Sequence, residues 1–236
     1  MTIHTAFAGF LLVYTAGSVV ANLRAKRLSA RRHGYLTYSL QLPLFVTAVG
    51  YTWVEGLLDR GLVNPFAWVL GLLSGHLVFG ISDYVMHQDT RAVWRHLRDV
   101  YGLYVFLREH PPVLFRFLLV STVEEIIYRA ALLTWCTTWM GAPTAIFVTA
   151  LVFSIVHRHF FENSLRQSLE FFIFALLLGW VYYATGSLAV VIAIHAVRNI
   201  QIAYLEYLIL YEETGDEEIA EQGVEAQLIH ETGIIR

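Results

Sequence analysis

Long apolar runs with few charges divide this chain of 236 residues into blocks, and they restrict it to a membrane fold. A helix needs about 20 mostly apolar residues to cross a bilayer. Only 15% of the residues are charged, against about a quarter in a soluble domain, so a water-soluble enzyme is excluded. We therefore expect an all-α polytopic membrane protein with about seven transmembrane helices. They are expected at residues 6–22, 36–57, 65–86, 113–139, 143–157, 168–184 and 187–210.

Net charge and cysteine content exclude several further classes of protein. The formal charge of −3 gives no basic surface for a nucleic-acid partner. Cys136 is the only cysteine, so the chain can form neither an intrachain disulfide nor a CxxC-type zinc site. Lys26 is the only lysine, a composition that favours a bacterial protein and hence the bacterial inner membrane.

Basic residues in the loops predict the orientation of the chain. The loop after the first crossing carries Arg24, Lys26, Arg27, Arg31 and Arg32. The loops at 87–112 and 158–167 also carry arginines, whereas the opposing loops carry only Arg60. Because loops rich in arginine and lysine stay in the cytoplasm, we expect the N-terminus outside and the C-terminus in the cytoplasm.

The order of apolar and charged segments divides the chain into three regions. Residues 1–111 form an N-terminal three-helix membrane region, which includes the basic loop and an amphipathic, interfacial helix in the segment 87–112. Residues 112–210 form a membrane core. Residues 211–236 are acidic, which predicts a solvated, partly disordered tail.

Three ionisable residues interrupt the fourth expected crossing. Glu124, Glu125 and Arg129 would each cost about 2.5–3.5 kcal/mol in the middle of a membrane helix. Glu125 and Arg129 are four residues apart and can form an ion pair on one face. Glu124 points about 100° away and has no such intrahelical partner. A buried polar network would explain the pair, but it explains Glu124 poorly.

Two later crossings add polar residues that complement this carboxylate. His157 ends the fifth crossing in the pattern FxxxH, and the last crossing carries His195 and Asn199 in the pattern HxxxN. Taken singly, such residues are often interfacial or bond one helix to another. Together they supply a base that can deprotonate water and donors that can stabilise an oxyanion, which hydrolysis requires.

The ordered set EExxxR, FxxxH and HxxxN, one motif on each of three helices, resembles the CPBP (CAAX protease and bacteriocin-processing) family. That family includes the type II CAAX prenyl endopeptidases, and the resemblance covers roughly residues 112–205. It implies that Glu124 and His157 activate water and that His195 and Asn199 form the oxyanion site. Glu125 and Arg129 become a structural or orienting ion pair.

The same resemblance implies an intramembrane endopeptidase of the glutamic type, acting in the lipid bilayer on a membrane-anchored protein or peptide tail. We expect no cofactor, because a scheme without a metal gives each of the four residues a separate task. A bacterial, myxosortase-like member of the family fits this pattern. Several relatives carry an asparagine four residues after the first histidine, where this chain has Phe161. Asn163 is out of register and receives no role. The sequence does not indicate an oligomeric state.

Other functions stay open on the residues alone. Glu124, His157 and His195 could hold a zinc ion with three protein ligands, which would make the chain a metalloprotease. The same buried polar residues, with His76 and Asp83, could serve a non-enzymatic membrane scaffold or a proton-coupled carrier. A rhomboid-like serine protease fits poorly, because residues 80–83 read GISD instead of GxSG, and the HExxH motif of zinc proteases is absent.

Overall fold

The computed structural model describes residues 2–24, 30–58 and 62–232 and confirms the all-helical class, with no strand in these ranges. The elements are α1 (Ile3–Leu23), α2 (Ala30–Val54), α3 (Pro65–His87), α4 (Thr90–Arg98), α5 (Val100–Glu109), α6 (Pro111–Glu125), the π-helical segment η2 (Ile126–Leu133), α7 (Thr134–Met140), α8 (Ala142–Val156), α9 (His159–Glu162), α10 (Leu165–Thr185), α11 (Leu188–Thr214) and α12 (Glu217–Thr232).

Four of the helices in the described ranges, α1, α3, α10 and α11, are long and apolar enough to cross a membrane. The chain is therefore an integral membrane protein, whereas the count of seven crossings stays a prediction. Helices do occupy all seven expected positions, with α8 a shorter apolar helix and the fourth formed by α6, η2 and α7 in succession. The basic positions Lys26 and Arg27, and Arg60 opposite them, lie outside the described residues.

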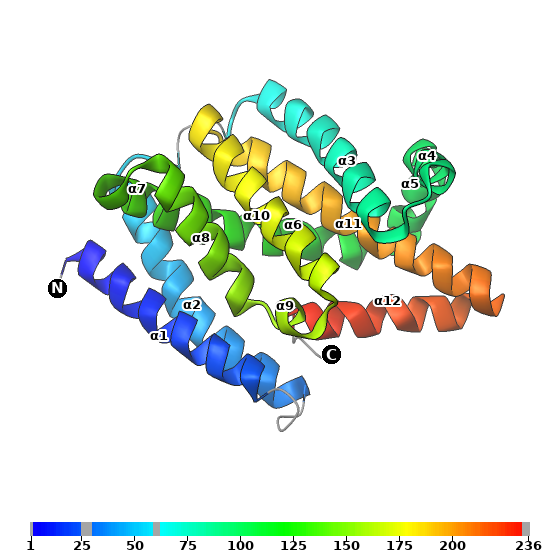
Figure 1. The fold of residues 1–236 in the computed structure, drawn as a ribbon, viewed down its shortest axis with the longest axis horizontal. Coiled ribbons are helices and arrows are strands. Elements are labelled where there is room, and N and C mark those ends of the chain that lie inside the picture. Colours follow the sequence, from blue (N-terminus) through cyan, green and yellow to red (C-terminus); the bar gives the residue numbers. More distant parts are fainter. Residues whose placement is uncertain (1, 25–29, 59–61, 233–236) are drawn as a thin grey trace.

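Helix α11 lies at the centre of the bundle. In its most apolar stretch 83% of the residues are buried, against 33% or 39% in the other three long helices. Figure 1 shows α11 between α3 on one side and α10 on the other, with the α1–α2 pair at the far edge of the molecule. The helix that carries two of the candidate site residues is thus the one most enclosed by protein.

Two glycines let α3 pack closely on α11. A Cβ atom added at Gly71 would lie 2.6 Å from the Cβ of Ala193, and one added at Gly75 would lie 3.0 Å from the Cα of Ile194. Small residues four apart allow such backbone contact between membrane helices. This close contact with α3 fixes the position of the part of α11 that carries His195.

We expect Gly71→Leu to separate α3 from α11 and to lower both the thermal stability and the activity of the protein. Overpacking of a close contact costs about 1–3 kcal/mol. Thermal unfolding in detergent measures the effect. Gly9→Leu is the matched control, because an added Cβ at Gly9 in α1 has no neighbour within 4 Å. Equal unfolding temperatures for the two variants would contradict this role of Gly71.

The acidic C-terminal region differs from its prediction. Residues 217–232 form α12, which packs back along α11, so the expected partial disorder is wrong for this segment. Ala220 and Val224 are buried, and Nε2 of His110 lies 3.8 Å from Oε1 of Glu221. Glu217, Glu218 and Glu221 are exposed, so the first turns of α12 are amphipathic. The segment expected to hold one interfacial helix contains two, α4 and α5.

Candidate active site

The two glutamates lie where the fourth apolar segment changes from α-helix to π-helix. Glu125 is the last residue of α6, and the π-helical turns of η2 follow it directly. Segments of this kind are frequent at functional sites, because the wider turn redirects side chains. Glu125 and Arg129 are both fully buried, and Glu124 is 8% exposed. The three charges thus lie inside the bundle and need partners there.

The ion pair expected between Glu125 and Arg129 is present. Nε of Arg129 lies 3.2 Å from Oε2 of Glu125. Arg129 also donates from Nη2 to the carbonyl of Ala175 at 3.4 Å, and its guanidinium lies over the ring of Phe153 at 4.8 Å. These contacts of Arg129 link η2 to α8 and α10. Breaking the buried pair would leave an uncompensated charge.

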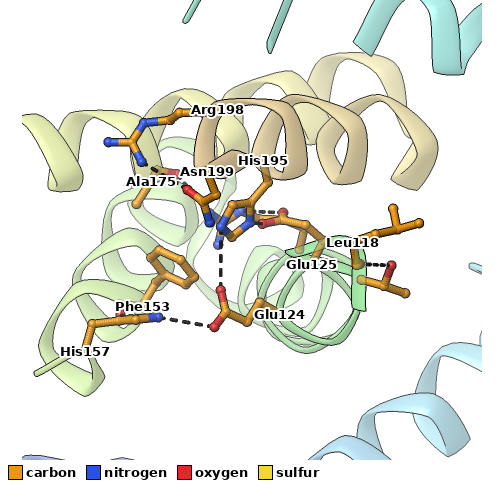
Figure 2. Close-up of polar contacts among 11 residues, drawn as sticks. Leu118, Glu124, Glu125, Phe153, His157, Ala175, His195, Arg198 and Asn199 are labelled. Carbon is orange, nitrogen blue, oxygen red and sulfur yellow. Dashed lines mark hydrogen bonds and ion pairs between the residues drawn. The ribbon is translucent and has the colours of Figure 1, made fainter. Parts of the chain in front are cut away.

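Glu124 contacts both candidate histidines. Its Oε1 lies 3.3 Å from Nε2 of His157, and its Oε2 lies 3.7 Å from Nε2 of His195 (Figure 2). The side chain that lacked a partner on its own helix therefore finds two partners on other helices. The structure brings together the carboxylate and the two imidazoles of the three sequence motifs.

His157 is oriented by the end of its own helix. Helix α8 ends at Val156, His157 has an extended backbone, and its Nδ1 donates to the carbonyl of Phe153 at 2.5 Å. In a neutral ring with hydrogen on Nδ1, Nε2 is an acceptor, and it faces a carboxylate oxygen of Glu124. Two acceptors at this distance share a proton. The pair is therefore arranged to hold and move a proton.

His195 joins the two glutamates. Its Nδ1 donates to Oε1 of Glu125 at 2.8 Å, and this hydrogen bond fixes the orientation of the imidazole ring. Its Nε2 faces Glu124 and can donate only when the ring is an imidazolium.

A cavity of about 500 Å³ lies in front of these groups. Small-molecule and cofactor sites are typically about 300–1,000 Å³ in volume. Glu124, His157, His195 and Asn199 all line it, so the four candidate catalytic residues share one space. Its apolar wall contains Met86, Phe117, Val120, Phe153, Phe171 and Ile202. A chain segment that enters this space meets these apolar side chains and also further polar ones, such as Gln167 and Glu206.

Several polar residues of this region were missed by the sequence analysis. Arg198 and Glu170 line the cavity and form an ion pair, with Nη2 2.7 Å from Oε2. Both interrupt apolar crossings, a signal that could have found them. Asn163 also lines the cavity, whereas Phe161 is 45% exposed.

His76 and Asp83 of α3 do not form one polar path. His76 contacts Gln201, and Asp83 contacts His87 and His96. Each residue is therefore satisfied within its own network, which is what a polar residue inside a helical bundle requires.

Asn22 of α1 supports His157 from outside the three motifs. Its Nδ2 donates to the carbonyls of Val156 at 2.9 Å and Ile155 at 3.4 Å, at the end of α8. These carbonyls have no partner within their own helix. The N-terminal region thus holds the backbone immediately before His157.

We expect Asn22→Ala to lower activity about 3- to 10-fold, because losing one net hydrogen bond worth about 1 kcal/mol loosens the backbone before His157. The turnover rate per folded protein measures this effect. Asn64→Ala is the control, since Asn64 caps α3 away from the cavity. A turnover rate equal to that of the control would contradict the role of Asn22.

Among the described residues, no group of three or more His, Cys, Asp or Glu side chains is arranged so that it could hold a metal ion. This includes Glu124, His157 and His195, the zinc ligands considered from the sequence.

Comparison with known proteins agrees with this site. Residues 107–201 match the family described as type II CAAX prenyl endopeptidase Rce1-like. The matched segment begins in α5, ends in α11 and contains all six candidate residues. The chain is therefore a helical membrane protein whose central segment is similar to a family of proteases. The similarity to this protease family covers the segment that carries the three motifs. No curated protein and no solved structure matches the chain.

Proposed function

We propose that the chain is an intramembrane endopeptidase that hydrolyses a membrane-anchored peptide or protein tail with a water molecule activated by Glu124 and His157. One observation carries the proposal: the Glu124 carboxylate contacts two imidazoles at the wall of a cavity large enough for a peptide. The family match, which is to a family of proteases, supports the reaction class.

In this proposal a water molecule in the cavity lies against Glu124 and His157 and loses a proton to that pair as its oxygen attacks the scissile carbonyl carbon. The carbonyl oxygen becomes an oxyanion, which the His195 imidazolium and the Asn199 amide stabilise by donating hydrogen bonds. The tetrahedral intermediate collapses when the C–N bond breaks, and the stored proton passes to the leaving amine. Each of the four residues then has a separate task.

The position of the cavity supports attack from the cytoplasmic side. It is lined by Met86 at the end of α3, by His159 and Asn163 after α8, and by Glu206 in the second half of α11. All of these positions lie toward the cytoplasm in the orientation expected from the basic loops. The substrate bond would then lie near the cytoplasmic half of the bilayer, which we propose is the bacterial inner membrane.

A comparison of membranes from two cell lines tests the proposal. One line expresses the protein and the other expresses Glu124→Gln, and mass spectrometry compares the terminal peptides of their membrane proteins. We expect a small set of tails to be cut only with the unaltered protein and to accumulate intact with the variant. Identical terminal peptides in the two lines would contradict the proposed activity.

Chelation tests the metal-free form of the mechanism. We expect the purified protein to keep its activity after exhaustive treatment with EDTA and phenanthroline, because Glu124 and His157 need no ion to activate water. A catalytic zinc would consume Glu124, His157 and His195 as ligands, leaving Asn199 as the donor for the oxyanion. Activity that is lost on chelation and restored by stoichiometric zinc would support the metalloprotease instead.

A further inference from the structure

A buried arginine is held tightly beside Asn199 at the wall of the cavity. Arg198 is 6% exposed, and its Nη2 donates to both carboxylate oxygens of Glu170, at 2.9 and 2.7 Å. Its Nε donates to Oγ of Ser82 at 3.1 Å, and Ser82 donates to Glu170 at 2.5 Å. The guanidinium also lies 4.3 Å above the ring of Phe174. Residues of α3 and α10 therefore fix the plane of the guanidinium.

The remaining nitrogen of this guanidinium contacts the amide of Asn199. Nη1 of Arg198 donates to Oδ1 of Asn199 at 3.2 Å (Figure 2). An arginine has donors and no acceptor, so only the amide oxygen can face it, and the NH2 group must point away. Figure 2 shows Asn199 between Arg198 and His195, on the side of the site where Glu124 lies.

We propose that Arg198 is a positioning residue, which holds the amide of Asn199 with its NH2 group toward the oxyanion. This inference rests on the proposed function. The last torsion of an asparagine side chain is broad, so an unrestrained amide could turn its oxygen toward the developing negative charge and oppose the reaction. Glu170 balances the charge of Arg198, and the contribution of Arg198 is therefore orientation of the amide.

Kinetics of four variants test the proposal, with a synthetic peptide that covers a tail identified in the membrane comparison. Arg198→Met combined with Glu170→Gln removes both charges together, which avoids a stranded carboxylate. We expect kcat to fall about 10- to 100-fold with little change in KM, and Asn199→Ala to lower kcat about 100- to 1,000-fold.

Adding the Arg198 and Glu170 substitutions to Asn199→Ala should cause no further loss, because the group that they orient is gone. Arg158→Met with Glu162→Gln is the matched control. That ion pair (2.8 Å) joins the residue before α9 to the last residue of α9, and its loss should leave kcat within about two-fold. The positioning role would be overturned if the losses in kcat from the two sets of substitutions multiply. It would also be overturned if kcat of the control falls as far as kcat of the Arg198 and Glu170 variant.

A measurement without substrate separates this inference from the proposed function. The chain has only four asparagines, so side-chain 15N labelling gives few NMR signals, and Asn199→Asp identifies the one from Asn199. We expect that amide to be ordered in the unaltered protein and mobile in the Arg198 and Glu170 variant. An unchanged signal would overturn the positioning role. If Glu124→Gln still cleaves, the proposed mechanism fails, while the NMR result stands independently.

Discussion

Glu124→Gln is expected to abolish cleavage while the protein still inserts, folds and accumulates. The substitution keeps the size of the side chain but removes the carboxylate that faces Nε2 of His157 and of His195. A general base contributes about 10²–10⁴-fold to a rate, so we expect turnover to fall by at least that factor. The loss should appear in kcat, since the cavity walls that bind the peptide are unchanged.

Turnover of the purified variant and its thermal unfolding in detergent check this expectation together. Glu109→Gln is the matched control, because Glu109 is an exposed carboxylate at the end of α5. We expect the control to keep full activity and both variants to unfold near the temperature of the unaltered protein. Cleavage at the normal rate by Glu124→Gln would remove the central catalytic assignment.

Arg129→Ala is expected to act mainly on stability. Removing the guanidinium leaves Glu125 fully buried and without its cation, and breaking a buried pair costs about 3–5 kcal/mol. The variant should accumulate poorly, and what remains should unfold at a lower temperature. Activity should fall as well, because Glu125 also holds Nδ1 of His195.

A double variant tests whether the instability of Arg129→Ala comes from the unpaired charge of Glu125. Arg129→Met with Glu125→Gln removes both charges, and such replacements are often neutral for stability. We expect abundance and unfolding temperature to recover largely, while activity stays low because His195 has lost its carboxylate partner. If Arg129→Ala is as stable as the unaltered protein and yet inactive, Arg129 contacts the substrate instead.

The sequence predicts those parts of this molecule that depend on local spacing. The positions of the long helices follow from the length of the apolar runs. The pairing of Glu125 with Arg129 follows from a separation of four residues. The meeting of Glu124 with His157 and His195 followed only from the family resemblance, because no local pattern says which helices are neighbours.

Contacts between distant segments were not predictable in this way. Asn22 supports α8 across more than a hundred residues of sequence, and Arg198 finds Glu170 on another helix. The acidic residues near the C-terminus suggested a solvated tail, although Ala220 and Val224, four residues apart, already marked one apolar helix face. The sequence analysis did not predict the π-helical turns of η2, in which every residue is buried.

Direct attack by water is the central claim, and quenched single-turnover mass spectrometry in heavy-oxygen water tests it most directly. Purified protein in lipid vesicles is mixed with the identified tail peptide and stopped with acid within the first turnover. The account predicts that the new carboxylate of the cut peptide contains heavy oxygen and that the mass of the protein never changes. A peptide fragment attached covalently to the protein, or a peptide that stays uncut, would contradict it.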